Sequence, residues 1–320
     1  MAVAQEAGAA CTEVPESRAG RVIVGPEAEV ASRPASSESR VGRIPFSVEM
    51  FPPKGQLTLD AARKVVEGLR AASPDFISVT CSAGGSGNGH GGQTVAIAEL
   101  IQNEAATPAI AHFTCVSATA SSVAAEVEAL RAAGVETVLA LRGDLAPGQE
   151  PADFRYAYEL ISHLKAAGLC VGAAAYPEGH IDCLDPRENI RHLRAKQEAG
   201  ADFFITQLFF NNDDFYRFRE AAESAGVAAP ISCGIMPFLG KSQIQRMVFL
   251  CGSSLPAPII KLLAKYENDP ASLRQAGIEY ACNQLVDLGR HGVDGLHVYA
   301  MNQPDIACAA AEAIAAAGLR

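Results

Sequence analysis

Eight short apolar runs recur along the sequence, and longer Ala-rich amphipathic segments separate them. The runs read IPFSVEMF, DFISVTC, AIAHFTC, ETVLALRGD, CVGAAAYP, DFFITQLFF, PISCGIMP and GLHVYAMN. Helix-like stretches lie between the runs, for example at 120–133, 186–199 and 272–290. Strands that alternate regularly with helices pair in parallel through right-handed crossovers. Eight such units in a chain of this length predict an α/β fold of the (β/α)8 TIM-barrel type.

A doubly wound open sheet is the alternative, but the first run is not followed by the Gly-rich fingerprint of a dinucleotide fold. With 320 residues, 49% of them hydrophobic, the chain can bury one large core. We therefore expect a single barrel domain over 41–320. Residues 1–40 are rich in Ala, Glu, Ser and Pro without apolar periodicity or a signal-peptide pattern, which predicts a flexible N-terminal extension.

The net charge and the cysteines limit the partners and the cellular compartment to be expected. A formal net charge of -10 provides no basic surface for nucleic acid or anionic lipid. No apolar run approaches the roughly 18 residues of a membrane-spanning helix, so neither nucleic acid nor a membrane is an expected partner. The nine cysteines contain no C-x-x-C pair and no metal-ligand spacing. They indicate reduced thiols in a cytoplasmic protein, without a metal site.

The run FSVEMFPPK, at 46–54, carries a single carboxylate, Glu49, among apolar residues. An ionised carboxylate that is buried without a partner is costly and usually takes up a proton. Glu49 is therefore a candidate acid, and the structural alternative is an ion pair with a lysine or arginine.

Polar residues follow or end seven of the apolar runs. In a (β/α)8 barrel the C-terminal ends of the strands form one rim, where active sites lie. We expect this rim to gather Glu49, Thr80, His112, Arg142, Asp144, Tyr176, Gln207 and Asn302.

Taken in order, several strings resemble the successive motifs of the methylenetetrahydrofolate reductases, over about residues 44–316. They are FSVEMFPPK, SVT, HFTC, LALRGDLAPG, AAYPEGH, KQEAGADFFITQLFF, GIMP and HVYAMN. The resemblance implies a (β/α)8 flavoprotein of one-carbon metabolism and methionine biosynthesis that binds FAD without a Rossmann fold. It implies a ping-pong reaction in which NADH or NADPH reduces the flavin, which then reduces 5,10-methylenetetrahydrofolate to 5-methyltetrahydrofolate.

The resemblance also implies residue roles. Glu49 matches the general acid that protonates the leaving nitrogen of the folate ring, and an apolar surrounding would raise the pKa of such a carboxyl. Asp144 matches a second catalytic carboxylate between flavin and folate. The implied FAD contacts are Thr80, Ala83, His112, Arg142, Gly143, Asp144, Ala157, Tyr176, His180 and Lys196. The implied substrate contacts are Glu49, Asp144, Gln207, Gln243, Tyr299 and Asn302.

Some positions depart from the family pattern. Asn189, His192 and Ala195 stand where bacterial members carry Asp, Asn and Arg facing FAD. Gln303 replaces a basic residue that meets the folate, and Met247 replaces an aromatic residue that stacks on bound substrate. These departures put the affinities for folate and FAD and the choice of nicotinamide in question.

Two other functions remain open on the sequence. One is the flavin subunit of a multi-protein reductase that receives electrons from a redox partner. The other is a flavin-free, pterin-dependent one-carbon transferase. The sequence does not distinguish a homo-oligomer from a complex with such a partner subunit.

Overall fold

The computed structural model describes residues 43–52, 59–81, 91–144, 148 and 150–320. The expected extension at 1–40 and one expected cofactor contact, Ala83, lie outside the described residues.

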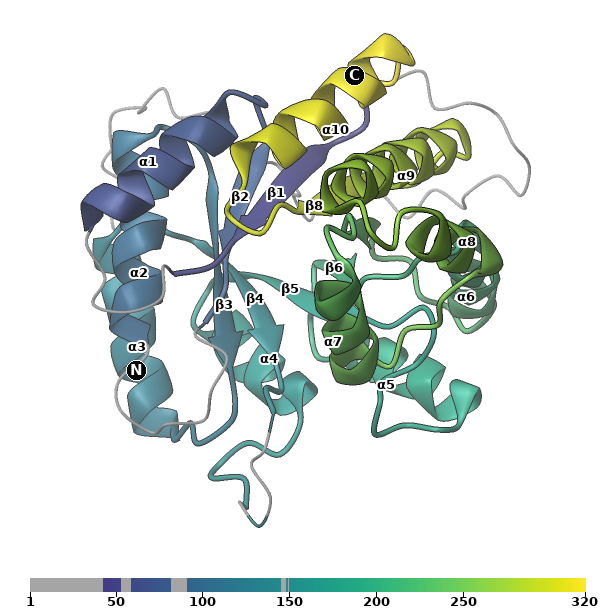
Figure 1. The fold of residues 1–320 in the computed structure, drawn as a ribbon. Coiled ribbons are helices and arrows are strands. Elements are labelled where there is room, and N and C mark those ends of the chain that lie inside the picture. The colour runs from purple at the N-terminus through teal and green to yellow at the C-terminus, as the bar shows by residue number, and fades with distance from the viewer. Residues whose placement is uncertain (1–42, 53–58, 82–90, 145–147, 149) are drawn as a thin grey trace, which may run out of the picture.

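Eight parallel strands close into a barrel in the order of the chain (Figure 1). The strands are β1 (Phe46–Met50), β2 (Phe76–Val79), β3 (Ala109–Thr114), β4 (Thr137–Leu141), β5 (Cys170–Ala175), β6 (Phe203–Thr206), β7 (Ile231–Ile235) and β8 (Gly295–Tyr299). The barrel closes where β8 pairs with β1, and in this register Glu49 is opposite Tyr299. The (β/α)8 prediction is confirmed, and the open-sheet alternative is wrong.

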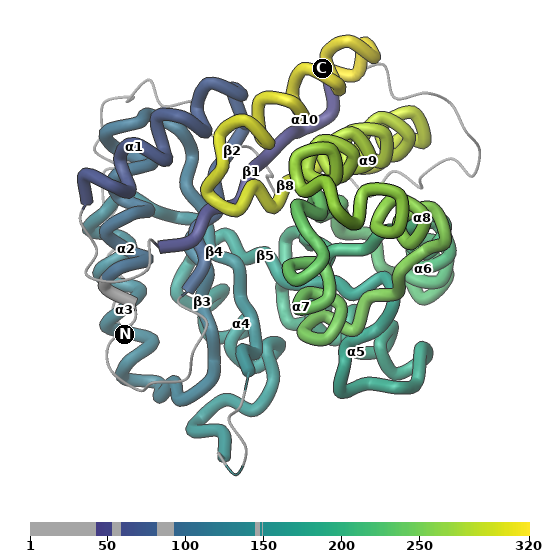
Figure 2. Tube along the Cα trace, viewed as in Figure 1, coloured from purple at the N-terminus to yellow at the C-terminus, as the bar shows by residue number. Residues whose placement is uncertain are grey.

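Helices follow the strands and surround the barrel, and the chain can be followed from purple to yellow in Figure 2. They are α1 (Leu59–Arg70), α2 (Gly91–Glu99), the π-helical η1 (Leu100–Glu104), α3 (Ala120–Ala132), α4 (Ala157–Ala166), α5 (Pro186–Glu198), α6 (Asn212–Ser224), α7 (Lys241–Cys251), α8 (Ala257–Lys265), α9 (Pro270–Arg290) and α10 (Pro304–Ala316). The last helix, α10, packs against both α9 and α1, so the end of the chain completes the ring of helices.

Local sequence signals explain several helix starts. Asp185, Asn211 and Asp269 each accept a hydrogen bond from a backbone N–H in the first turn of α5, α6 and α9. Such side chains satisfy N–H groups that have no partner within the helix. Proline occupies the first turn of α5 and α9, where its missing N–H and fixed φ cost nothing.

Strand alternation divides the core into two parts. Phe46, Val48 and Met50 are fully buried in the layer between barrel and helices, together with α1 residues such as Val66. Side chains on the other face of the strands fill the barrel interior, where Phe76, Ile110, Leu139, Phe203 and Ile205 form a separate apolar cluster. Each such buried side chain contributes roughly 1.5–3 kcal/mol. Most of this inner cluster lies in the first half of its strands, which leaves the C-terminal half for polar groups.

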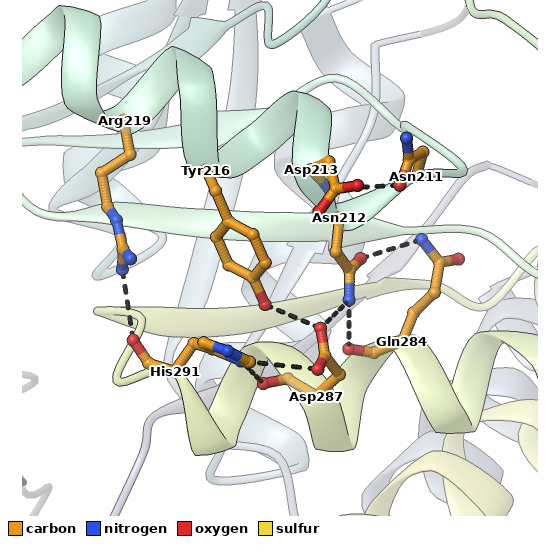
Figure 3. Close-up of polar contacts among 8 residues, drawn as sticks. All are labelled: Asn211, Asn212, Asp213, Tyr216, Arg219, Gln284, Asp287 and His291. Atoms are coloured by element: carbon orange, nitrogen blue, oxygen red, sulfur yellow. Dashed lines mark hydrogen bonds and ion pairs between the residues drawn. The ribbon is translucent and has the colours of Figure 1, made fainter.

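A polar network joins α6 to α9 (Figure 3). Asn212 Nδ2 and the Tyr216 hydroxyl both donate to Asp287 Oδ2, each over 2.7 Å. Gln284 Nε2 donates to Asn212 Oδ1 over 3.1 Å, and the His291 ring lies against the Asp287 backbone carbonyl. Because α9 leads directly into β8, this network holds the helix that delivers the last strand to the barrel.

Among the described residues, no helix combines the length and apolar character that crossing a membrane requires. The described cysteines, from Cys81 to Cys308, are free thiols.

Candidate active site

Most of the residues expected at the rim lie at the C-terminal ends of their strands. Glu49 is the penultimate residue of β1, and Thr80, Arg142, Tyr176 and Gln207 directly follow β2, β4, β5 and β6. His112 lies deeper, within β3, and Asn302 lies three residues beyond β8.

Glu49 faces the barrel interior, where its side chain is 18% exposed. Its Oε2 atom lies 3.4 Å from His112 Nε2 and 3.9 Å from His297 Nε2. Among the described residues no lysine or arginine forms an ion pair with it. The expected apolar surrounding was wrong, because the adjacent residues Val48 and Met50 point to the opposite face of the strand. The carboxyl group meets two imidazoles instead.

Both imidazoles are buried, and neither Nε2 atom has a hydrogen-bond partner. Burial lowers the pKa of His112, the nearby charge of Glu49 opposes this shift, and His297 adds to it. His297 shares a 2.7 Å hydrogen bond with the buried Ser47 through its Nδ1 atom. His112 was expected in the site, whereas Ser47 and His297 were missed. The signal was present in the alternation, because each lies two residues before an expected site residue, Glu49 or Tyr299.

Tyr299 spans the mouth of the barrel from β8 to β6. Its hydroxyl donates to the Thr206 backbone carbonyl over 2.5 Å, crossing β7 at Gly234. A Cβ atom at Gly234 would lie 2.4 Å from the Thr206 carbonyl oxygen and 2.7 Å from the Tyr299 hydroxyl, so glycine is required there. Burial raises the pKa of Tyr299 well above its usual value, and the charge of Glu49 raises it further. Tyr299 is thus a neutral wall of the site beside Glu49.

A cavity of about 250 Å³ opens between the ends of β4 and β5 and the helices α4 and α5. Five of the expected cofactor contacts line it, namely Arg142, Ala157, Tyr176, His180 and Lys196. Thr80, His112, Gly143 and Asp144 do not line it. The described residues that were expected to contact the cofactor therefore divide into those that line the cavity and those that lie outside it.

Lys196 provides an unneutralised positive charge in this cavity. Its Nζ donates to the Ala174 carbonyl over 2.8 Å and lies 5.1 Å from the centre of the Tyr176 ring. No described carboxylate forms an ion pair with it. Burial, assisted by the charge of Arg142, lowers the pKa of Lys196 to about 8. A partly buried cation without an acidic partner among the described residues fits an anionic ligand such as a phosphate.

The segment after β4 is held in a defined shape. Arg142 forms an ion pair with Asp182, with Nη2 and Oδ2 2.7 Å apart. Gly143 adopts a φ of +78°, and a Cβ atom there would approach Val116 to 2.7 Å, so this position requires glycine. Asp144 follows and is exposed to solvent.

Two positions that depart from the family pattern also line the cavity. Asn189 Nδ2 donates to the Tyr176 carbonyl over 2.8 Å, so this amide supports the end of β5. The ring of His192 stacks on Tyr156 at 5.8 Å, and its Nε2 lies 3.5 Å from Glu188.

The expected substrate contacts are engaged within the protein to different degrees. Gln207 Oε1 accepts from the Leu208 N–H, and Gln243 Oε1 accepts from the Leu239 N–H. Asn302 exchanges two hydrogen bonds with the backbone of Phe51, at 3.0 and 2.8 Å, which ties the end of β1 to the loop after β8. Asn302 thus has an observed structural role.

The two remaining departures lie near the same rim. Met247 is partly buried on α7, against a third apolar cluster, separate from the two described above, that includes Phe210 and Phe238. Gln303 Oε1 accepts a 2.8 Å hydrogen bond from Arg274, so a guanidinium group lies beside the position that lacks a basic residue.

A (β/α)8 barrel with acid–base groups in its mouth and a cavity with charged side chains at its rim has the architecture of barrel enzymes. Residues 35–315 match the family model described as methylenetetrahydrofolate reductase, and the chain belongs to that family.

Named relatives agree with the family match. The chain is 29% identical over 269 residues to the 5,10-methylenetetrahydrofolate reductase of Escherichia coli K12, covering 84% of this chain and 90% of that protein. It is 30% identical over 285 residues to methylenetetrahydrofolate reductase (NADH) 1 of Arabidopsis thaliana, covering 83% of this chain and 47% of the plant protein. The chain thus spans about half the length of the plant relatives it matches.

Among solved structures, this chain resembles that of a protein from Clostridium thermocellum that binds two copies of 5-methyl-5,6,7,8-tetrahydrofolic acid. The TM-score between the two structures is 0.58. The match covers 87% of this chain and 96% of that one, at 14% identity. At this identity the likeness shows the fold alone.

Proposed function

We propose that this protein reduces 5,10-methylenetetrahydrofolate to 5-methyltetrahydrofolate, with FAD as cofactor and NADH or NADPH as hydride donor in a ping-pong reaction. The observation that carries the proposal is Glu49, a carboxyl group in the barrel mouth between two imidazoles and without a permanently charged partner among the described residues. Family membership and the name of the similar Escherichia coli protein support it.

The cavity residues fit a flavin dinucleotide. Lys196 supplies positive charge for a diphosphate, Arg142 lies nearby in its ion pair with Asp182, and Tyr176 supplies an aromatic face. Bound FAD would accept a hydride from the nicotinamide and pass it to the folate. The protein's contribution is to bind the two reactants, orient them and hold a proton at Glu49.

The role proposed for Glu49 follows from the balance of the reaction. Converting the methylene bridge to a methyl group consumes one hydride and one proton. A C–N bond of the five-membered ring breaks, the leaving nitrogen takes the proton of Glu49, and the resulting iminium carbon accepts the hydride. A carboxyl group held at the barrel mouth can donate this proton by general acid catalysis.

Asp144 is proposed as the second catalytic carboxylate. It follows the rigid Arg142–Gly143 turn at the end of β4, and its side chain is exposed at the rim. A fixed negative charge there would orient the N–H donors of a pterin ring and stabilise the cationic folate intermediate. The expected contacts Gln207, Gln243 and Tyr299 remain candidates for binding the pterin.

The proposed setting is the cytoplasm, which the free thiols of the described cysteines support.

The test is the absorbance spectrum of the purified full chain, followed by anaerobic addition of each nicotinamide and then of the folate. We expect a yellow protein that releases FAD on denaturation, bleaches with NADH or NADPH and recovers its colour with 5,10-methylenetetrahydrofolate. A colourless protein after expression with riboflavin would favour the flavin-free transferase and overturn the proposal. A flavin that neither nicotinamide bleaches, with dye-driven folate reduction intact, would favour the redox-partner subunit.

A further inference from the structure

We propose that Ser47 and His297 form a positioning pair that directs an N–H donor at Glu49 and stabilises the carboxylate left after proton donation. This inference rests on the proposed function for its catalytic meaning. The effect of Ser47 and His297 on the ionisation of Glu49 is a property of the protein that can be measured without any turnover.

The pair is placed by strand pairing. Ser47 and Glu49 project from the same face of β1, and His297 is the direct register partner of Ser47 on β8. Ser47 is 1% exposed and His297 is fully buried. The His297 ring stacks on Phe76 and contacts Tyr299 edge-on, which fixes its plane. The imidazole therefore has one orientation, with Nδ1 toward Ser47 and Nε2 toward Glu49.

The hydrogen bonds indicate which nitrogen carries the proton. A neutral imidazole has one N–H, and a carboxylate can only accept hydrogen bonds. A bare Nε2 lone pair facing an ionised Glu49 would be repulsive, whereas an Nε2–H would be attractive. The 2.7 Å contact between Ser47 Oγ and Nδ1 allows the serine to donate its hydroxyl proton there, in preference to the Leu296 carbonyl at 3.3 Å. Ser47 thereby favours the tautomer with Nε2–H.

The bond from His297 to Glu49 forms during the reaction. His297 Nε2 is buried without a partner and lies 3.9 Å from Glu49 Oε2, which is longer than a hydrogen bond. Catalytic hydrogen bonds commonly tighten when the substrate binds. After Glu49 transfers its proton to the folate nitrogen, the new carboxylate accepts the Nε2–H bond of His297. No bond to hydrogen in His297 is broken, so His297 acts through Glu49.

Other groups also face Glu49. His112 approaches from β3 at 3.4 Å, and Tyr299 lies beside it on β8. Tyr299 directs its hydroxyl to the Thr206 carbonyl and so does not donate to Glu49. His297 differs from His112 in having its other ring nitrogen held by a buried hydroxyl. The effect of removing Ser47 separates the contributions of the two imidazoles.

The experiment follows the ionisation of Glu49 by carbon-13 NMR of the glutamate carboxyl in the full chain, with the signal identified by its loss in Glu49→Gln. Removing an N–H donor from a carboxylate makes the carboxyl keep its proton to higher pH. We expect the ionisation midpoint in His297→Leu to rise by about one pH unit, a tenfold change in ionisation constant. Ser47→Ala should shift the midpoint the same way by less. His297→Gln, whose amide N–H reaches the Nε2 position, should return it toward the wild-type value.

Ser253→Ala is the matched control. Ser253 is a second buried serine, between α7 and α8, and its hydroxyl donates to the Leu208 carbonyl over 3.0 Å. Its loss should leave the midpoint unchanged. If His297→Leu does not fold, Ser47→Ala against Ser253→Ala still decides the question. Equal midpoints in wild type, Ser47→Ala and His297→Leu would overturn the inference. Shifted midpoints in a protein that reduces no folate would instead remove the proposed function and leave the positioning pair standing.

Discussion

His112 Nε2, on β3, lies 3.4 Å from Glu49 Oε2, on β1, with β2 between the two strands. Burial lowers the pKa of His112, so the imidazole adjoining the proposed acid is uncharged at neutral pH. Among the described residues, no fixed cation pairs with Glu49 to hold it ionised, and its contacts with nitrogen atoms are those with the two imidazoles.

The lowered pKa of His112 predicts an acid-sensitive contribution to stability. In the unfolded chain this histidine ionises near its usual pKa of 6.5, while the folded state resists ionisation. Its contribution is complete above pH 6.5 and is lost as pH falls through that value toward the folded pKa. We expect His112→Gln to lose less free energy of unfolding than wild type between pH 7.5 and 5.5, measured by urea titration. His163→Gln, at an exposed histidine, is the control, and an equal loss in all three proteins would contradict the prediction.

Replacing Lys196 is expected to raise the stability of the flavin-free protein and to lower its affinity for FAD. Lys196→Met removes a partly buried cation whose pKa desolvation lowers to about 8, so the flavin-free variant should be more stable than wild type below pH 8. It should also bind FAD about 10- to 100-fold more weakly, the effect of one charge-assisted hydrogen bond. Flavin fluorescence titration and thermal unfolding check the two effects.

The pH dependence of Lys196 has a defined sign. Because burial lowers its pKa to about 8, wild-type FAD affinity should fall as pH rises through 8. Over the same window, up to the usual pKa of 10.5, the flavin-free protein should gain stability relative to Lys196→Met. Lys261→Met, at an exposed residue of α8, makes the same charge change away from the cavity. An equal loss of FAD affinity in both variants would show that only net charge matters.

Weakening the polar network between α6 and α9 is expected to lower the free energy of unfolding without affecting the proposed site. Burial tends to raise the pKa of Asp287, but hydrogen bonds from Asn212 and Tyr216 outweigh it and lower the pKa. Tyr216→Phe removes one of these bonds. Because the Asp287 side chain is 47% exposed, water replaces part of the loss, and we expect a cost of about 0.5–1 kcal/mol. Urea unfolding measures it, and a changed FAD affinity would contradict a structural role.

Replacing Gln303 with arginine is expected to change the KM for folate without changing flavin reduction. Gln303→Arg adds a positive charge beside Arg274, which Asp305 partly neutralises through a 2.6 Å ion pair. We expect the KM for folate to fall by up to about fivefold, the scale of an exposed ionic contact. The rate at which nicotinamide bleaches the flavin should not change. An effect on bleaching alone would show that position 303 does not meet the folate.

The barrel could be predicted from the sequence because each strand combines a short apolar run with a following helical segment. The run DFFITQLFF, for example, became β6 and was followed by α6. The helix after GIMP, which carries Gln243, was expected and is α7, whereas the additional helix α8 was not anticipated, because it interrupts the simple strand–helix alternation before α9. Rim positions followed from strand ends, since parallel strands in a barrel all end at one face.

The surroundings of Glu49 could not be predicted from its neighbours in sequence. Those residues lie on the opposite face of β1, and the groups that do surround Glu49 come from β3 and β8, 63 and 248 residues later in the chain. Contacts of this kind depend on strand register, which local patterns do not define. The same reason explains why the pairing of Ser47 with His297 was missed.

The central claim is that Glu49 donates the proton that opens the folate ring, and that Asp144 acts differently. Anaerobic stopped-flow measurement of each half-reaction, in wild type, Glu49→Gln and Asp144→Asn, tests it most directly. Glu49→Gln should bleach with nicotinamide at a nearly normal rate, yet reduce folate at least about 10⁴-fold more slowly, the upper end of general acid catalysis. Asp144→Asn should perturb both half-reactions and folate affinity while keeping measurable turnover. If Glu49→Gln slows bleaching by nicotinamide as much as it slows folate reduction, Glu49 is a structural or flavin-binding residue and the account is contradicted.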